Sequence, residues 1–298
     1  MQQQQPVNFS PVIAGTMKWG AWGSRFNTNE YLQLIDDCLA MGVTTFDHAD
    51  IYGHYTTEEE FGKALAERKS MRQQMQLITK CGIKLVSANR PHHAIKHYDT
   101  SKEHIIHSAH LSLKHLHTDY IDVLLIHRPD PLMNPDEIAE AFTKLKNEGK
   151  VLHFGVSNFT PSQVEMIASR FPIITNQIEL SILYLKPFID GTLDQCITKK
   201  ILPTAWSPLG GGNLFAQAED DERAKRIIAV ADILAEKYTT AADQILLSWL
   251  LQHPAGIVPV LGTSKTDRIK KAMEATKIKM ERQEWFMLWR ASTGHEVA

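Results

Sequence analysis

Four side chains that could handle a proton stand close behind apolar segments of the sequence: Asp47, Tyr52, Lys80 and His127. A free phenol has a pKa of about 10 and is therefore a poor acid at neutral pH. A nearby ammonium group stabilises the phenolate and lowers that pKa, while a carboxylate beside the ammonium keeps the lysine charged. A histidine could donate to a carbonyl oxygen and orient a substrate. Together the four residue types would protonate an oxygen that gains negative charge, as in carbonyl reduction.

Each of the four also has a purely structural interpretation. Asp47 and Tyr52 could be a strand end and a surface aromatic. Lys80 could be a solvated strand end, and His127 a hydrogen-bonded histidine of the core. The chemical interpretation therefore depends on the elements that carry these residues and on whether they bring all four together.

Eight short segments with the composition of strands alternate with segments of helical periodicity. The expected strands cover residues 12–15, 44–47, 76–80, 120–127, 153–157, 173–179, 202–206 and 257–261. We expect residues 50–53 to form a loop, residues 81–99 a long polar connection, and Glu58–Glu60 a solvated helix start. An amphipathic tail holds Trp285 and Trp289. The expected helices cover residues 27–41, 57–68, 101–116, 135–148, a stretch from 160, 190–200, 222–237, 241–253 and 265–275.

Eight alternating units in 298 residues favour an α/β fold, a (β/α)8 TIM barrel with extra helices near the C-terminus. An open dinucleotide-binding sheet would carry Gly-x-Gly-x-x-Gly after an early strand, and the sequence has none. Active-site groups of such barrels gather at the C-terminal ends of the strands. The residues at those ends are too polar to be chosen only for packing, so we expect an active site there: Gly15-Thr16, Asp47, Lys80, His127, Ser157-Asn158, Gln177, Trp206-Ser207 and Gly262-Thr263.

The composition limits the class of protein. With 43 % hydrophobic and 22 % charged residues, we expect one globular domain over residues 1–298, with residues 1–10 loosely ordered. A formal net charge of −2 argues against nucleic acid as the main partner. Three cysteines far apart imply no disulfide framework, and no apolar run approaches the length of a membrane span. The start of the chain does not have the pattern of a signal peptide, so a cytoplasmic location is expected.

The strand ends belong to longer motifs spread over nearly the whole chain. These are Gly15-Thr16-Met17, Phe46-Asp47-His48-Ala49-Asp50-Ile51-Tyr52-Gly53, Ile78-Thr79-Lys80, Asp119-Tyr120-Ile121-Asp122, His127-Arg128-Pro129-Asp130, Gly155-Val156-Ser157-Asn158-Phe159, Asn176-Gln177-Ile178-Glu179 and Trp206-Ser207-Pro208-Leu209-Gly210. In this order they resemble the aldo-keto reductase family, and in particular bacterial oxidoreductases of the YdhF type. The resemblance implies a barrel that binds NADP(H) and reduces a small carbonyl substrate. It assigns the catalytic tetrad to Asp47, Tyr52, Lys80 and His127, with Tyr52 as proton donor.

The resemblance also assigns cofactor contacts. Ser157, Asn158 and Gln177 would hold the nicotinamide carboxamide, because a hydroxyl and two amides suit an uncharged group that donates and accepts. Trp206 would stack on the nicotinamide ring, although a core tryptophan would look the same in the sequence. The full set of implied contacts is Gly15, Thr16, Met17, Asp47, Ser157, Asn158, Gln177, Trp206, Ser207, Pro208, Leu209, Gly210, Gly211, Gly262, Thr263, Ser264, Lys265 and Arg268.

Phosphate groups account for the last part of that set. Residues 207–212 would wrap the pyrophosphate with backbone N–H groups, and residues 263–268 would bind a phosphate at the start of a helix. The sequence departs from the family where relatives often contact the adenine with a glutamate and an asparagine, because Lys271-Ala272 stands there.

Two other functions compete with carbonyl reduction. A regulatory module that keeps the cofactor with little turnover would share the fold, but the complete tetrad argues for turnover, and no obligatory protein partner is evident. A metal-dependent hydrolase barrel would need converging ligands. The histidines at 92, 93, 97, 104, 107, 110, 115 and 117 are numerous, but His104, His107 and His110 spread round a helix, so we expect no metal.

Overall fold

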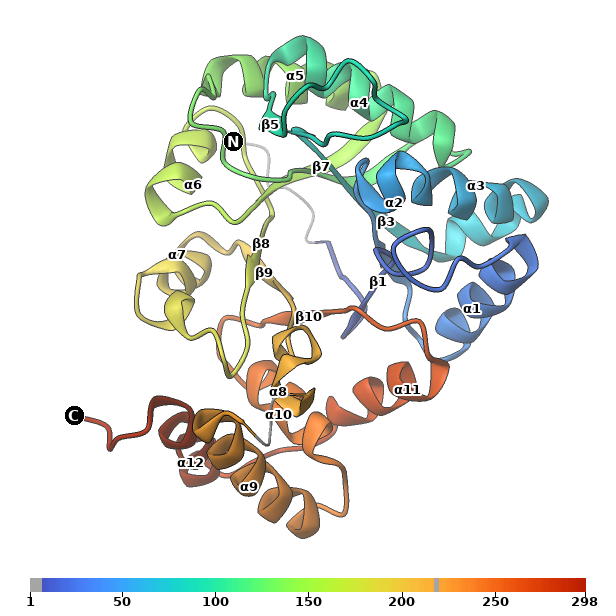
Figure 1. The fold of residues 1–298 in the computed structure, drawn as a ribbon. Helices are drawn as coiled ribbons and strands as arrows, with labels where there is room; N and C mark the ends of the chain where they lie inside the picture. Colours follow the sequence, from blue (N-terminus) through green and yellow to red (C-terminus); the bar gives the residue numbers. More distant parts are fainter. Residues whose placement is uncertain (1–6, 217–219) are drawn as a thin grey trace.

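The computed structural model describes residues 7–216 and 220–298, and its centre is a closed barrel of parallel strands (Figure 1). The barrel closes where the first strand pairs with the last, Ile13 lying opposite Val260. The prediction of an eight-stranded α/β barrel is therefore confirmed. In order around the barrel, the strands are β1 (Ile13–Gly15), β2 (Thr45–Asp47), β3 (Gln76–Cys81), β6 (Ile121–Ile126), β7 (Val151–Ser157), β8 (Thr175–Glu179), β9 (Leu202–Trp206) and β10 (Val258–Leu261).

Helices surround the barrel (Figure 1), and side chains at their first turns explain where several begin. Asn27 and Thr160 each form a capping box, and Asn134 caps a helix that has Pro135 in its first turn. These helices are α1 (Thr28–Ala40), α3 (Thr57–Glu67), α4 (Lys102–His115), α5 (Pro135–Asn147), α6 (Pro161–Ala168), α7 (Thr192–Lys199), α10 (Ala242–Leu251) and α11 (Thr266–Ala275).

Several segments add to the elements expected from the sequence. The polar connection 81–99 contains a small antiparallel hairpin, and the expected loop runs into a short helical turn, α2 (Tyr52–Tyr55). The expected tail is a full helix, α12 (Arg282–Thr293), which packs beside α9 (Figure 1). The remaining elements are β4 (Ile83–Lys84), β5 (His97–Tyr98), α8 (Asn213–Ala216), α9 (Glu222–Lys237) and three 3₁₀ helices, η1 (Lys69–Gln74), η2 (Lys186–Phe188) and η3 (Gly210–Gly212).

The expected loose segment 1–10 lies partly outside the described residues. Within it, Ser10 is buried, and its backbone N–H donates to Thr45 Oγ1 at 3.0 Å. Thr45 N in turn donates to Ser10 Oγ at 3.1 Å. This reciprocal pair ties Ser10 to the start of β2.

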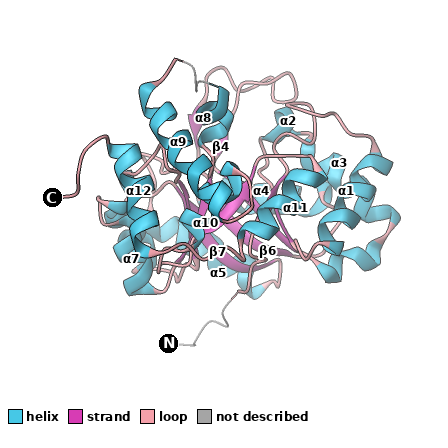
Figure 2. Ribbon diagram, turned by 90° about the horizontal axis from the view of Figure 1, so that it is seen from below, coloured by secondary structure: helices cyan, strands magenta, loops and turns pink. Residues whose placement is uncertain are grey.

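The barrel interior determines which strand residues reach the C-terminal end. Ile78 and Leu125 belong to a buried cluster in which strands from opposite sides of the barrel meet. Side chains alternate along a strand. Lys80 and His127, each two residues further along the chain, therefore face the same interior, one layer nearer the end. Figure 2 shows the barrel from the side, with α2 and α8, which follow β2 and β9, at the same end.

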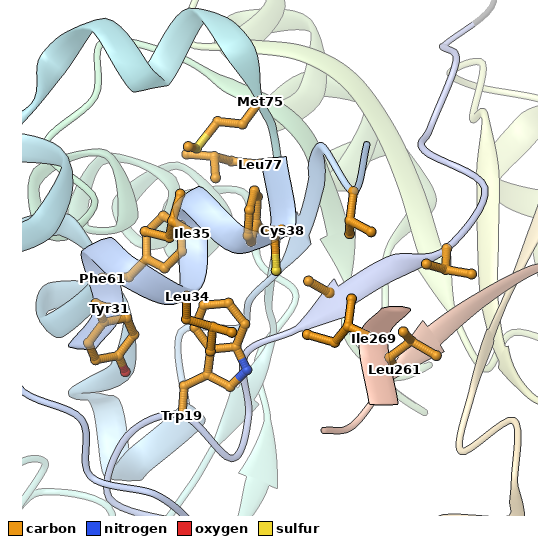
Figure 3. Close-up of a cluster of buried hydrophobic side chains, with 14 of the residues drawn as sticks. Trp19, Tyr31, Leu34, Ile35, Cys38, Phe61, Met75, Leu77, Leu261 and Ile269 are labelled. Atoms are coloured by element: carbon orange, nitrogen blue, oxygen red, sulfur yellow. The ribbon is translucent and has the colours of Figure 1, made fainter. Parts of the chain in front are cut away.

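A second cluster packs the outside of the barrel against α1, α3 and α11 and orients β2 (Figure 3). Trp19 is fully buried there, with its ring centroid 6.1 Å from Phe46 and 6.2 Å from Phe61. Because Phe46 points outward into this cluster, the next residue, Asp47, points into the barrel.

A third cluster joins α10 to α12. Trp249 and Trp285 stack with ring centroids 4.8 Å apart, and Trp289 lies 5.7 Å from Trp285. Each indole N–H of the first two donates to the other residue's carbonyl oxygen, at 3.1 and 3.0 Å. The C-terminal helix is thereby part of a packed core. In the described part of the chain, no helix combines the length and apolar character needed to span a bilayer.

Candidate active site

Three of the four expected catalytic side chains meet at the mouth of the barrel. The buried Lys80 ammonium donates to Asp47 Oδ2 at 2.7 Å, to the His48 carbonyl oxygen at 2.6 Å and to Tyr52 Oη at 3.1 Å. An ammonium group has three donors and no acceptor, so all three of its protons have partners. Tyr52 Oη therefore accepts from Lys80, and the phenol proton is left for another acceptor.

His127 completes the group of four. Its ring stands edge-on to the Tyr52 ring, with centroids 6.1 Å apart. The side chain is buried, and Nδ1 has no hydrogen-bond partner among the described residues. Burial, and then the positive charges of Lys80 and Arg128, hold the pKa of His127 well below its ordinary value. The imidazole is therefore neutral at pH 7 and can donate from one nitrogen.

The electrostatics of Tyr52 differ from the expectation of a lowered pKa. Burial raises the pKa of Tyr52 above its ordinary value of 10.0 and outweighs the Lys80 ammonium, which acts in the lowering direction. The expectation was wrong because it omitted the hydration that the phenolate would lose. Burial lowers the pKa of Lys80, but Asp47 and Tyr52 more than compensate and raise it above 10.5. At neutral pH the site thus holds a protonated phenol beside a charged ammonium.

A chain of hydrogen bonds connects Asp47 to the ends of three further strands. Gln177 on β8 donates from Nε2 to Asp47 Oδ1 at 2.8 Å. Ser157 on β7 donates to the Gln177 carbonyl oxygen at 2.9 Å, and Asn158 Nδ2 donates to Ser157 Oγ at 2.8 Å. The indole N–H of Trp206, at the end of β9, donates to Asn158 Oδ1 at 2.9 Å. The structure therefore fixes these five side chains relative to one another.

The Trp206 ring borders the mouth of the barrel and is half-buried. Its N–H is held by Asn158, which sets the plane of the indole. The guanidinium of Arg128, the residue after His127, lies 5.4 Å from the centre of this ring. An indole and a cation therefore lie together at the mouth of the barrel.

The rim between β9 and β10 consists of residues 207–212 and 262–268. Ser207 and Gly210–Gly212 all have left-handed φ angles, from 51° to 91°, while Pro208 is buried and Leu209 packs against the core. A Cβ atom on Gly212 or Gly262 would meet no atom within 4 Å, so the space beside this backbone is open.

The second half of the rim carries the expected phosphate-binding residues. Ser264 Oγ lies 2.8 Å from Ser24 Oγ, and Thr263 Oγ1 accepts from the Lys265 backbone N–H at 3.1 Å. Lys265 is the N-cap residue of α11 and Arg268 lies in its first turn, and both side chains are exposed. Two cations and an open rim thus stand at the positive end of a helix.

The three residues at the end of β1, Gly15, Thr16 and Met17, differ in how far they reach the surface. A Cβ on Gly15 would come within 2.7 Å of the Leu261 carbonyl oxygen, so this glycine allows β1 and β10 to approach closely. Thr16 is fully buried, and its hydroxyl is bonded to the Asp47 carbonyl oxygen at 3.0 Å and to His48 Nδ1 at 2.9 Å. Only Met17, 39 % exposed, presents its side chain to the surface.

Glu58 contradicts the expectation of a solvated helix start. Its side chain is buried and accepts hydrogen bonds from Thr79 Oγ1 at 2.6 Å and Ser112 Oγ at 3.0 Å. Burial raises its pKa to about 7, against the lowering effect of these two hydroxyls. The signal in the sequence was the helical spacing of Glu58 with Phe61 and Leu65, which places all three on the buried face.

Several side chains of the histidine-rich segment border a small cavity. His93, His104, His107 and His115 line a cavity of about 170 Å³ together with Asp50 and other polar residues. Within residues 7–216 and 220–298, no group of three or more His, Cys, Asp and Glu side chains has the arrangement of a metal site.

The comparisons with known proteins agree with the fold. Residues 11–291 match the pattern of the Aldo/keto reductase family. This chain is an aldo-keto reductase. It is 42 % identical to oxidoreductase YdhF of Escherichia coli, over 98 % of this chain and 97 % of that protein. It is also 42 % identical to 6-dehydroglucose reductase of Agrobacterium fabrum, over 89 % and 88 %.

The fold comparison extends this similarity to a solved structure. The thermostable aldo-keto reductase Tm1743, crystallised with the inhibitor epalrestat, matches with a TM-score of 0.77 and 26 % identity over 97 % of each chain. The family membership and the YdhF-type resemblance expected from the sequence motifs are thereby confirmed for this aldo-keto reductase.

Proposed function

We propose that this aldo-keto reductase reduces aldehyde and ketone carbonyls to alcohols with NADPH, and that Tyr52 donates the proton. The observation that carries the proposal is the contact of Lys80 Nζ with Tyr52 Oη at 3.1 Å. Because Lys80 can only donate, it directs the Tyr52 proton away from itself and toward the mouth of the barrel. A protonated phenol held this way suits an acid that must deliver its proton to a substrate oxygen.

His127 would complete the acid site. Its neutral ring, edge-on to Tyr52, can donate to the same carbonyl oxygen. As that oxygen gains negative charge, the Lys80 ammonium stabilises the phenolate left on Tyr52. Asp47 keeps the ammonium charged and in place, at 2.7 Å. These four residues thus supply proton transfer and charge stabilisation, while bound NADPH would supply the hydride.

The residues at the barrel mouth fit a nicotinamide cofactor. The amides of Asn158 and Gln177 retain hydrogen-bonding capacity beyond their present bonds, because each has two donors and an oxygen with two lone pairs. The hydrogen bond at the edge of Trp206 fixes the plane of its indole, which suits stacking on an aromatic group. The open space beside Gly212 and Gly262 suits a pyrophosphate close to the backbone.

The exposed cations at the start of α11 support NADPH over NADH. Lys265 and Arg268 stand at the positive end of the helix, next to the hydroxyls of Thr263 and Ser264. A 2′-phosphate would pair with these groups, whereas the 2′-hydroxyl of NADH would not. We propose the full set of cofactor contacts expected from the sequence, with Gly15 and Thr16 shaping the strand end.

A polar sugar aldehyde or ketone is the more specific substrate candidate. The relative from Agrobacterium fabrum is named a 6-dehydroglucose reductase, and so is a relative from Novosphingobium aromaticivorans, 34 % identical over 98 % of this chain. The cationic Arg128 beside Trp206 would favour a substrate rich in oxygen acceptors over a plain hydrocarbon aldehyde.

The proposal is tested with purified protein, NADPH and a panel of aldehydes and ketones that includes 6-oxo-glucose, following loss of NADPH absorbance. We expect turnover by the wild type and at least a 10²-fold lower kcat for Tyr52→Phe, with NADPH binding unchanged. Tight NADPH binding without turnover on any carbonyl would favour the regulatory module instead. A Tyr52→Phe variant that keeps most of the wild-type kcat would refute the role of Tyr52.

A further inference from the structure

The three residues after Tyr52 share an unusual backbone conformation. Gly53 and His54 both have φ of 59°, and Tyr55 has φ of 72°. Left-handed residues normally occur singly, and a bulky residue such as tyrosine is a clear outlier there. A strained segment of this kind persists only where the surrounding structure holds it, and such segments gather at functional sites.

The holding contacts come from the segment between β4 and β5. Tyr55 Oη accepts from the Leu85 backbone N–H at 2.7 Å and lies 3.3 Å from the Leu85 carbonyl oxygen, to which it donates. Asn89 Nδ2 donates to the His54 carbonyl oxygen at 2.8 Å. The guanidinium of Arg90 lies 4.4 Å from the centre of the Tyr55 ring. Both non-glycine residues of the left-handed segment, His54 and Tyr55, are therefore held by contacts with the β4–β5 hairpin.

The left-handed segment in turn determines where Tyr52 lies. The Thr56 N–H donates to the Tyr52 carbonyl oxygen at 3.1 Å, and Thr56 Oγ1 donates to the Gly53 carbonyl oxygen at 2.8 Å. Among the described residues, the Tyr52 side chain accepts one hydrogen bond, the 3.1 Å bond from Lys80. A shift of this backbone would therefore lengthen the contact between the acid and the ammonium.

We propose that Tyr55 is a positioning residue: its hydroxyl, bonded to Leu85, holds the left-handed segment that directs Tyr52 toward Lys80 and the substrate oxygen. The proposal rests on the proposed function, since it assumes that Tyr52 is the acid. Asn89 supports the same segment through His54 but is exposed, so its contribution is smaller. The hairpin thus acts on the chemistry without touching the reacting atoms.

Tyr55→Phe tests this inference, because it removes the two Leu85 bonds and keeps the ring. We expect kcat to fall about tenfold, since misplacement of a catalytic group by a fraction of an ångström to 1 Å lowers rates to that extent or more. The NADPH dissociation constant should stay within twofold. The deuterium isotope effect on kcat with 4-deuterated NADPH should rise, because hydride transfer limits turnover more strongly.

Tyr238→Phe is the matched control. It also removes two hydroxyl bonds, to the Lys279 carbonyl oxygen at 3.1 Å and to Glu284 Oε2 at 2.6 Å, between α9 and the region of α12. Both variants should lose some stability, but Tyr238→Phe should keep the wild-type kcat and isotope effect. Asn89→Ala should lower kcat two- to threefold, and this variant tests the same inference if Tyr55→Phe does not fold.

Hydrogen exchange supplies a readout that does not require turnover. The amides of Tyr55 and Thr56, bonded to the Ile51 and Tyr52 carbonyl oxygens, should exchange faster in Tyr55→Phe and at the wild-type rate in Tyr238→Phe. A Tyr55→Phe variant with wild-type kcat, isotope effect and exchange would overturn the positioning role. Faster exchange with no catalysis by the wild type would instead contradict the proposed function and leave the conformational role of Tyr55 intact.

Discussion

Replacing Lys80 by methionine perturbs the site at its centre. The variant removes all three hydrogen bonds of the ammonium and leaves the Asp47 carboxylate buried, with Gln177 as its remaining side-chain donor. Methionine has nearly the same length and no charge, so it fills the space without supplying a donor. The consequences separate into an effect on the rate and an effect on the folded state.

The rate effect follows from the contact with Tyr52. Without the ammonium the phenolate formed on proton transfer has no cation beside it, so we expect kcat for carbonyl reduction to fall at least 10²-fold, the lower end of the range for a disturbed general acid. That factor corresponds to about 2.7 kcal/mol of transition-state stabilisation. Lys80 lowers the pKa of Tyr52, so its loss should raise that pKa further. The alkaline limb of the pH–rate profile should therefore move to higher pH.

The stability effect follows from burial. The side chains of Lys80 and Asp47 are 0 % and 3 % exposed, and removal of one partner from such a pair typically costs about 3–5 kcal/mol. The double variant Lys80→Met/Asp47→Asn should recover part of this loss, because no charge is left unpaired, but none of the activity. Urea unfolding measures the loss of stability, and steady-state kinetics from pH 6 to above pH 10, where the raised pKa of Tyr52 places the alkaline limb, measures the effect on the rate.

Lys225→Met is the control, because Lys225 is an exposed lysine paired with Glu222 on α9. It should change neither kcat nor the pH–rate profile. Near-normal turnover of Lys80→Met with an unshifted profile would refute the reasoning and make Lys80 a structural residue.

Two further substitutions test other parts of the molecule. Arg268→Ala should weaken NADPH binding about tenfold and leave NADH binding almost unchanged, because one lost charge-assisted hydrogen bond is worth about 1.5–3 kcal/mol. Titration of both nucleotides by the quenching of Trp206 fluorescence measures the two affinities. Equal affinities of the wild type for NADH and NADPH would contradict this prediction. Glu58→Gln should stabilise the protein at pH 8 by up to about 3 kcal/mol and have little effect near pH 4.5, because burial raises the folded-state pKa of Glu58 from 4.5 to about 7. A raised carboxyl pKa means that the folded state binds the proton more tightly than the unfolded state, so the stability of the wild type should fall as pH rises from 4.5 to 7. Urea unfolding across this pH range should show the fall in the wild type and not in Glu58→Gln.

The barrel and the convergence of Asp47, Lys80 and His127 could be predicted because strand periodicity determines which residues face the interior and where each strand ends. The direction in which the pKa of Tyr52 shifts could not be predicted, because it depends on burial, and residue types alone do not determine burial. The expectation that Glu58 is solvated was wrong because it considered the charge of the residue and not its helical spacing with Phe61 and Leu65, which places it on the buried face. The left-handed conformation of Tyr55 had no signal in the sequence, because tyrosine rarely adopts it and contacts with Leu85, Asn89 and Arg90, distant in the sequence, explain it.

The stacked indoles of α10 and α12 have a consequence for how this molecule can be observed. Of its six tryptophans, Trp249, Trp285 and Trp289 lie together in one cluster, whereas Trp206 stands at the barrel mouth. Trp19 is buried in the cluster beside β2, and the Trp22 ring lies 6.1 Å from the Tyr52 ring. Intrinsic emission is therefore a sum of several populations, and a ligand at the mouth can quench only the part that comes from Trp206 and Trp22. Near-ultraviolet circular dichroism, which is sensitive to close parallel indoles, would report on the packing of α12 instead. One protein thus offers separate optical signals for ligand binding and for detachment of its last helix.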